Sequence, residues 1–135
     1  MRAGFLTSAA GLAGRPLPAR PEFAFVGRSN CGKSSLINHF LGCPGLAHTS
    51  RTPGRTRLLN YYLVDDRFYL VDLPGYGFAK VSHDQRDKWW LLFRSLLADR
   101  ARARAVAHLM DVRVPPTTQD REVAADRLHV EGGAT

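Results

Sequence analysis

The sequence predicts an α/β fold in three layers, with a mostly parallel sheet that carries one antiparallel edge strand. Short apolar runs alternate with segments of helical spacing, an order typical of helices packed on both faces of a parallel sheet. Two of these runs are separated only by a turn around Asp65 and Asp66, which indicates a hairpin and therefore an antiparallel pair. With 135 residues, the chain is long enough for one domain with its own core.

The element boundaries follow from these patterns. We expect strands near residues 22–27, 57–65, 67–72 and 105–111, and helices near 33–42, 84–99 and 118–129. The second helix is expected to face the core through apolar side chains at helical spacing, which are Trp89, Leu92, Phe93, Leu96 and Leu97. Trp90 and Arg94 fall on another face of this helix, either as a contact surface or as an ordinary solvated face.

Residues 1–21 are expected to be an N-terminal flank that precedes the domain of residues 22–135. The flank contains no acidic residue, so an organellar transit peptide stays open as an alternative. Its mildly apolar part is interrupted by polar residues and glycines, which disfavours a signal peptide, and its Pro-rich end favours an extended entry into the first strand. No stretch of the chain approaches the length of a membrane span.

Residues 27–35 read GRSNCGKSS, which completes the phosphate-binding pattern G-x-x-x-x-G-K-[ST]. In such a loop, glycines let successive backbone N–H groups curl around a di- or triphosphate, while Lys33 adds a positive charge and the hydroxyl of Ser34 can bind Mg²⁺. Because an apolar run precedes the loop and helical spacing follows it, the phosphates would lie at a helix N-terminus. The expected phosphate-binding residues are Gly27, Arg28, Ser29, Asn30, Cys31, Gly32, Lys33, Ser34 and Ser35.

A second motif follows the strand predicted at 67–72. An aspartate at the carboxyl end of a neighbouring strand would face the phosphate loop, so Asp72 is expected to hold Mg²⁺ through a water molecule. The amide of Gly75 could then contact a γ-phosphate. The nucleotide-binding residues expected in this motif are Asp72, Leu73, Pro74 and Gly75.

A basic, turn-rich segment, TPGRTR (52–57), lies between the two motifs. Its Thr56 is placed to become a second hydroxyl ligand of Mg²⁺ when a triphosphate is bound. The nucleotide-binding residues expected here are Gly54, Arg55, Thr56, Arg57 and Leu58. Behind a phosphate loop, this order and spacing point to a GTPase-type switch.

With these motifs in place, residues 21–82 resemble the EngB/YihA (YsxC) family of TRAFAC-class bacterial GTPases. The likeness is carried by GRSNCGKSSLIN (27–38), TPGRTR (52–57), LNYY (59–62) and DLPGYGFAKVS (72–82), and residues 110–120 look like the family's sequence after the fourth strand. The resemblance implies a Ras-like P-loop NTPase fold and GTP hydrolysis as a switch in assembly of the large ribosomal subunit, with cell division and septation as the older label. It also implies GTP and GDP as ligands, Mg²⁺ as cofactor, ribosomal RNA or a large-subunit precursor as partner, and a cytoplasmic monomer.

The resemblance also implies roles for single residues. Lys33 and Thr56 would be the catalytic residues, because Lys33 neutralises charge on the transferred group and Thr56 binds the Mg²⁺ that bridges the β- and γ-oxygens. Tyr76 stands where many GTPases place a water-orienting Gln, so slow intrinsic turnover is expected. Asn30 either helps to hold K⁺, as in potassium-stimulated relatives, or only tightens the loop. Cys31 is either a small apolar substitution or a reactive thiol at a helix N-terminus.

The chain departs from the family pattern in the part that reads the base. The family recognises guanine with an Asn/Thr-Lys-x-Asp loop after a fifth strand, whereas residues 117–120 (Thr-Thr-Gln-Asp) lack the Lys and follow the fourth strand. We therefore expect a partial domain, incomplete at its C-terminus and with an unpaired edge on the strand at 105–111, whose guanine preference rests on the resemblance. The alternatives are a truncated, non-catalytic remnant with a basic RNA-binding surface, and a different P-loop enzyme such as a small kinase, which DLPGYG and Thr56 disfavour.

The charge of the chain favours a polyanionic partner such as ribosomal RNA. The formal net charge is +7 and the isoelectric point is about 10.1. The basic side chains concentrate in the expected switch and around the end of the second helix, at Arg51, Arg55, Arg57, Arg94, Arg100, Arg102 and Arg104. For the second group, a solvated helix face is the alternative. The two cysteines, Cys31 and Cys43, give no disulfide framework and fit a reducing cytosol.

The residue types at Asn30 and Tyr76 predict a potassium-dependent turnover. Hydrolysis is expected to be slow in sodium and faster in potassium, because a bound K⁺ would supply positive charge beside the transferred phosphoryl group. Turnover measured in matched potassium and sodium buffers checks this. Equal rates in both buffers would remove K⁺ from the mechanism and leave Asn30 a loop-tightening residue.

Overall fold

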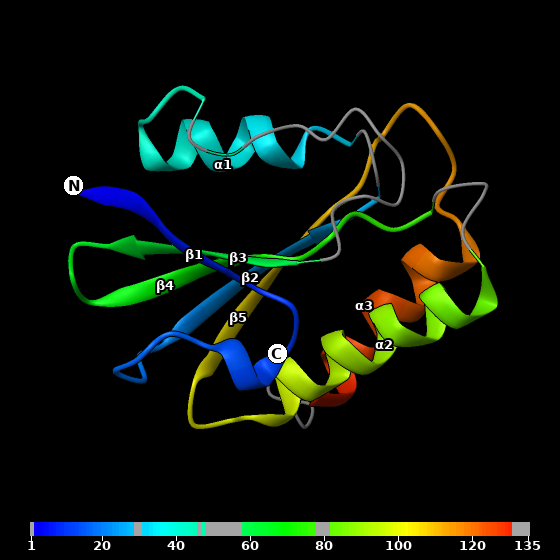
Figure 1. Ribbon diagram of the computed structural model, residues 1–135. Helices are drawn as coiled ribbons and strands as arrows, with labels where there is room; N and C mark the ends of the chain where they lie inside the picture. The colour runs from blue at the N-terminus through cyan, green and yellow to red at the C-terminus, as the bar shows by residue number, and fades with distance from the viewer. Residues whose placement is uncertain (1, 29–30, 46, 48–57, 78–81, 131–135) are drawn as a thin grey trace.

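A five-stranded mixed sheet forms the middle layer of the protein, with α1 on one face and α2 and α3 on the other (Figure 1). The computed structural model describes residues 2–28, 31–45, 47, 58–77 and 82–130, the last four of these without their side chains. The strands are β1 (Ala3–Ala9), β2 (Glu22–Gly27), β3 (Leu59–Val64), β4 (Phe68–Asp72) and β5 (Ala103–Leu109). The helices are α1 (Lys33–Leu41), α2 (His83–Ala98) and α3 (Thr118–Val130), with a short 3₁₀ turn, η1, at Leu12–Gly14.

The sheet confirms the predicted α/β class and corrects the position of its antiparallel strand. The strand order is β1-β3-β4-β2-β5, with β2 parallel to both β4 and β5. β3 runs antiparallel to β4 and also to β1, so β3 lies inside the sheet and β1 forms that edge. The hairpin was predicted correctly, because Asp65 and Asp66 take left-handed backbone angles (φ 51° and 56°) that match a tight turn of this hand. At the other edge, β5 begins and ends two residues earlier than expected.

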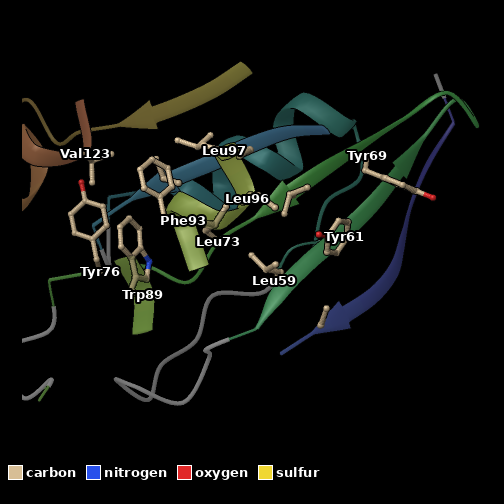
Figure 2. Packing of buried hydrophobic residues seen from close by; sticks show 14 residues of the cluster. Leu59, Tyr61, Tyr69, Leu73, Tyr76, Trp89, Phe93, Leu96, Leu97 and Val123 are labelled. Atoms are coloured by element: carbon tan, nitrogen blue, oxygen red, sulfur yellow. The ribbon is translucent and has the colours of Figure 1, made fainter. Parts of the chain in front are cut away.

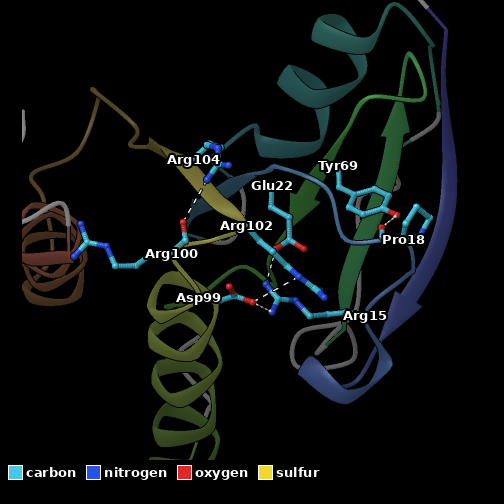
Figure 3. Close-up of polar contacts among 8 residues, drawn as sticks. All are labelled: Arg15, Pro18, Glu22, Tyr69, Asp99, Arg100, Arg102 and Arg104. Atoms are coloured by element: carbon cyan, nitrogen blue, oxygen red, sulfur yellow. Dashed lines mark hydrogen bonds and ion pairs between the residues drawn. The ribbon is translucent and has the colours of Figure 1, made fainter.

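The segment expected as an N-terminal flank contains the edge strand β1. Its sequence, AGFLTSA, has small and polar residues that give only a weak strand pattern, and its register with β3 shifts between Phe5 and Thr7. Arg15 then joins this segment to the domain, because its guanidinium donates to Glu22 on β2 at 2.7 Å and to Asp99 after α2 at 2.8 Å (Figure 3). The N-terminal residues therefore belong to the sheet and its packing.

The two faces of the sheet carry separate apolar clusters. Ala24, Val26 and Val71 face α2 and α3, whereas Phe25, Leu70 and their neighbours face α1. On α2, four of the five residues predicted to face the core are buried (Trp89, Phe93, Leu96 and Leu97), and Leu92 packs against them half-buried (Figure 2). The cluster holds α2 and the first part of α3 against the same side of the sheet.

Trp90, the remaining aromatic residue of α2, packs against Arg94, which contacts α3. The guanidinium of Arg94 lies 4.7 Å from the centre of the Trp90 ring and donates to Asp126 of α3 at 2.7 Å. Arg94 thus joins α2 to α3 through Asp126. This explains why the second face of α2 combines an aromatic ring with a basic side chain. An apolar cavity of about 260 Å³ lies on the α1 side of the sheet, between Phe40 and strands β4, β2 and β5. Within the described residues, no helix combines the length and apolarity that crossing a bilayer would require.

Replacing Arg15 by Met is expected to lower the free energy of unfolding by about 3–5 kcal/mol, since Glu22 is only 2% exposed and would lose its cation. Burial is the main cause that raises the pKa of Glu22, and Arg15 opposes it. Urea unfolding of the variant measures the loss. The control is Lys88→Met, which breaks a pair with Asp84 whose side chains are 72% and 76% exposed and should cost less than about 1 kcal/mol. Equal small losses in both variants would contradict a stabilising role for Arg15.

Candidate functional site

The carboxyl ends of β2 and β4 bring the two predicted motifs together. In their parallel register, Phe25 pairs with Asp72, and the N–H of Leu73 donates to the carbonyl of Phe25 at 3.1 Å. Three residues after Leu73, the N–H of Tyr76 donates to the carbonyl of Gly27 at 3.2 Å. The DLPG segment therefore runs beside the first residue of the phosphate loop, as the strand order predicted.

Helix α1 begins inside the phosphate loop and directs its N-terminus at this edge of the sheet. Gly32 precedes the helix with φ 87°, a left-handed angle that a residue with a side chain adopts only under strain. Its carbonyl accepts the first helical hydrogen bond, from the N–H of Leu36 at 3.0 Å. Lys33 and Ser34 therefore lie in the first turn, where the N–H groups of a helix N-terminus and the helix dipole favour an anion. Ser29 and Asn30 lie outside the described residues.

An ion pair joins the two motifs directly. The ammonium of Lys33 donates to Oδ1 of Asp72, and the two side chains are only 12% and 6% exposed. Burial is the main cause that raises the pKa of Asp72, while the positive charge and hydrogen bond of Lys33 act to lower it. The two opposite charges thus neutralise each other between the phosphate loop and the DLPG motif.

Of the site residues predicted between the two motifs, the structure describes Leu58 and leaves the others outside the described residues. Gly54, Arg55, Thr56 and Arg57 lie outside the described residues, so the role of Thr56 stays a prediction. Leu58 lies just before β3 and is 39% exposed. In the second motif, Leu73 and Pro74 are buried and Gly75 is half-buried.

Tyr76 does not stand free beside the phosphate loop. Its side chain is buried, and its hydroxyl hydrogen-bonds with Nε2 of His108 at 2.8 Å and donates to Oδ1 of Asp120. Burial and the neighbouring carboxylate of Asp120 raise the pKa of Tyr76, so the phenol stays protonated. This agrees with the expectation that Tyr76 does not replace a water-orienting Gln. No short-range pattern indicated this network, because His108 and Asp120 come from β5 and α3.

The tetrapeptide at 117–120 caps a helix. Thr117 Oγ1 accepts from the N–H of Asp120 at 3.1 Å, and Oδ2 of Asp120 accepts from the N–H of Thr117 at 2.8 Å. This reciprocal pair is a capping box at the start of α3. The tetrapeptide therefore resembles the base-reading loop but forms a helix cap. This agrees with its position after the fourth predicted strand, where the family's base-reading loop follows a fifth.

Cys31 lies half-buried in the phosphate loop. Burial is the main cause that raises the pKa of its thiol, which favours the small apolar substitution over the reactive thiol. Among the residues that the structure describes, no group of three or more His, Cys, Asp or Glu side chains could hold a metal ion. A magnesium ion here would combine the hydroxyl of Ser34 and, through water, the carboxylate of Asp72 with oxygens of the ligand, and such oxygen donors suit Mg²⁺.

Comparison with known proteins agrees with this geometry. Residues 22–130 match the family described as "50S ribosome-binding GTPase". The chain belongs to this family. Among curated relatives, it is 49% identical over 121 residues to the probable GTP-binding protein EngB of Chlorobaculum parvum, covering 90% of this chain and 63% of that protein. It is also 50% identical over 122 residues to the EngB of Desulforamulus reducens, covering 90% of this chain and 60% of the relative. These matches confirm the resemblance to EngB.

A solved structure shows the same fold. A crystal structure of a probable GTP-binding protein EngB superposes with a TM-score of 0.51 at 23% identity, covering 83% of this chain and 55% of that one. The chain thus spans less than two thirds of the length of the relatives it matches. The P-loop NTPase fold predicted from the motifs is confirmed.

Replacing Lys33 by Ala is expected to abolish triphosphate binding, because the ammonium is removed while the phosphates keep their charge. The same change leaves the carboxylate of Asp72 buried without its cation, so a raised Asp72 pKa and some loss of stability are also expected. Titration with a fluorescent GTP analogue, together with circular dichroism to confirm folding, measures the effect. Lys88→Ala, at an exposed pair, serves as the control. Unchanged affinity in a folded Lys33→Ala protein would falsify the assigned role.

Proposed function

We propose that this chain binds GTP and GDP and hydrolyses GTP as a switch in assembly of the large ribosomal subunit, as a monomer in the cytoplasm. The observation that carries the proposal is the contact between Lys33 and Asp72, which joins the phosphate loop to the DLPG motif. A match to a 50S ribosome-binding GTPase family and relatives described as GTP-binding proteins support it. The family's older label of cell division and septation belongs to the same proposal.

The residues would divide the work by the groups they carry. Lys33 and the N–H groups at the start of α1 would hold the phosphates, and the N–H of Gly75 would contact a γ-phosphate. Magnesium would be held by the hydroxyls of Ser34 and Thr56, and by Asp72 through water. When bound, Mg²⁺ supplies charge neutralisation between the β- and γ-oxygens. A potassium ion at Asn30 would add a second positive charge.

Slow turnover is part of the proposal. A water-orienting side chain must reach the γ-phosphate, whereas the hydroxyl of Tyr76 is engaged with His108 and Asp120. Tyr76 is the residue that directly follows the DLPG motif. Efficient hydrolysis would then depend on K⁺ or on a partner that contributes a catalytic group.

The basic surface supports an RNA partner. Arg100 and Arg104 are exposed where α2 leads into β5, and the carbonyl of Arg100 accepts from the guanidinium of Arg104 at 3.3 Å (Figure 3). Arg102 lies between them, 3.6 Å from Asp99. With a net charge of +7, such a surface would attract the phosphates of ribosomal RNA or of a large-subunit precursor.

The second candidate function is that of a non-catalytic protein which keeps this basic surface. It is favoured by the lack of a base-reading Asn/Thr-Lys-x-Asp loop in the sequence. Under this alternative, the chain would bind RNA with a strong dependence on salt but would bind no nucleotide. The two candidates therefore differ in one measurable property.

Thermal unfolding with Mg²⁺ and GTP, GDP or ATP separates the two candidates. GTP and GDP are expected to raise the melting temperature, because a ligand at 100 times its Kd adds about 2.7 kcal/mol to the free energy of unfolding. The ATP sample measures how much base selectivity this part of the chain supplies, and similar shifts for GTP and ATP are expected. Phosphate release is measured on the same protein. If no nucleotide shifts the melting temperature while RNA binding persists, the non-catalytic function replaces the proposed one.

A further inference from the structure

We infer that Tyr76, His108 and Asp120 form a latch that positions the N–H of Gly75 for a γ-phosphate. The inference rests on the proposed GTP-binding function. It assigns Tyr76 a positioning role in place of the water-orienting role that its position in the motif suggested. It also adds two residues, His108 and Asp120, from elements outside both nucleotide motifs.

Both neighbours of Gly75 are held by the backbone and by α2. On one side, the carbonyl of Pro74 accepts from the indole N–H of Trp89, a buried residue of α2, at 2.8 Å. On the other side, the N–H of Tyr76 donates to the carbonyl of Gly27 at 3.2 Å, and Arg28 forms a parallel bridge with Tyr76. Gly75 is therefore fixed between two anchored residues, so its N–H has little freedom to turn away from a bound phosphate.

The ring and hydroxyl of Tyr76 extend this anchorage to α2, β5 and α3. The ring packs edge-on against Trp89, with 5.1 Å between the ring centres (Figure 2). The hydroxyl hydrogen-bonds with His108 of β5 and donates to Asp120 of α3. Three separate elements, α2, β5 and α3, thus hold one side chain. Moving Tyr76 would require all of these contacts to break together.

Asp120 makes the latch costly to open. Its side chain is buried, at 3% exposure, and a buried carboxylate is stable only when hydrogen bonds satisfy its oxygens. Burial acts to raise the pKa of Asp120, but the hydrogen bonds from Tyr76 and Thr117 outweigh it and keep the pKa below its ordinary value. One oxygen depends on Tyr76 and the other on Thr117, so withdrawal of the phenol would leave Oδ1 without that donor.

The inference predicts a specific effect on nucleotide preference. The N–H of Gly75 would contact only the γ-phosphate, so loosening it should weaken binding of triphosphate and leave binding of diphosphate unchanged. A residue that only stabilised the fold would lower both affinities, or neither. The ratio of the GTP and GDP affinities therefore separates positioning from general stability.

The test is Tyr76→Phe, which keeps the ring packing and removes the hydroxyl. Affinities for GDP and for a non-hydrolysable GTP analogue are measured with Mg²⁺ on the full chain. The analogue is expected to bind about 10-fold more weakly to the variant, which corresponds to about 1.4 kcal/mol, while GDP binding stays unchanged. Tyr61→Phe is the matched control, because Tyr61 is equally buried in β3 and its hydroxyl lies outside the latch.

A second pair of variants keeps the inference testable if Tyr76→Phe folds poorly. Asp120→Asn retains an oxygen that can accept from Tyr76, whereas Asp120→Ala removes it, and both weaken the cap of α3. The affinity ratio should fall for the Ala variant and be largely retained by the Asn variant. If the parent protein prefers triphosphate but the ratio is unchanged in Tyr76→Phe and Asp120→Ala, the latch is wrong and the proposed function stands. If the parent protein binds neither nucleotide, the proposed function fails and the inference fails with it.

Discussion

The parallel pairing of β2 with β4 is the contact on which the remainder of the structure depends. These two strands form the centre of the sheet, with β5 on one side and β3 on the other. Their register decides that Asp72 lies beside Phe25, and hence that the residues after Asp72 run along the phosphate loop. A shift of one residue would turn Asp72 to the opposite face and separate it from Lys33. The geometry of the site is thus a consequence of strand register.

The same pairing explains why the site can carry opposite charges in a buried place. Asp72 ends a strand inside the sheet, and Lys33 begins the helix that covers one face, so each charge is removed from water by a different element. Neither charge would be stable there alone. Under the proposed function, a ligand that brings both negative phosphate oxygens and a divalent cation would replace each partner of this pair.

Much of the fold was accessible from local patterns. The strand before the phosphate loop, the hairpin at Asp65 and Asp66, and the core face of α2 each depend on residues that are close in sequence. β1 was not predicted, because its small and polar residues give no strong periodicity and its stability comes from pairing with β3 and from the ion pairs of Arg15. Long-range contacts of this kind leave no short-range pattern to detect.

The candidate site was likewise predicted only in the parts that depend on residues close in sequence. The phosphate loop and the DLPG motif were predicted because each needs a particular run of residues to bind phosphate and metal. The partners of Tyr76 were not, since His108 is one residue of an ordinary strand and the segment of Asp120 was compared with a base-reading loop, whereas it forms a helix cap. A side chain that serves two structural purposes, as Asp120 does, gives a sequence pattern for only one of them.

The position of β1 has a consequence for the order in which the protein can form during synthesis. The side chain of Ser8 in β1 donates to Asn60 in β3, a residue made 52 positions later. β1 therefore leaves the ribosome well before its partner strand and has to wait, unpaired, while β2 and α1 are translated and can begin to associate. Only after the β3–β4 hairpin has been made can β1 complete its edge of the sheet, so β1 is made before β2, β3 and β4 but reaches its place after them.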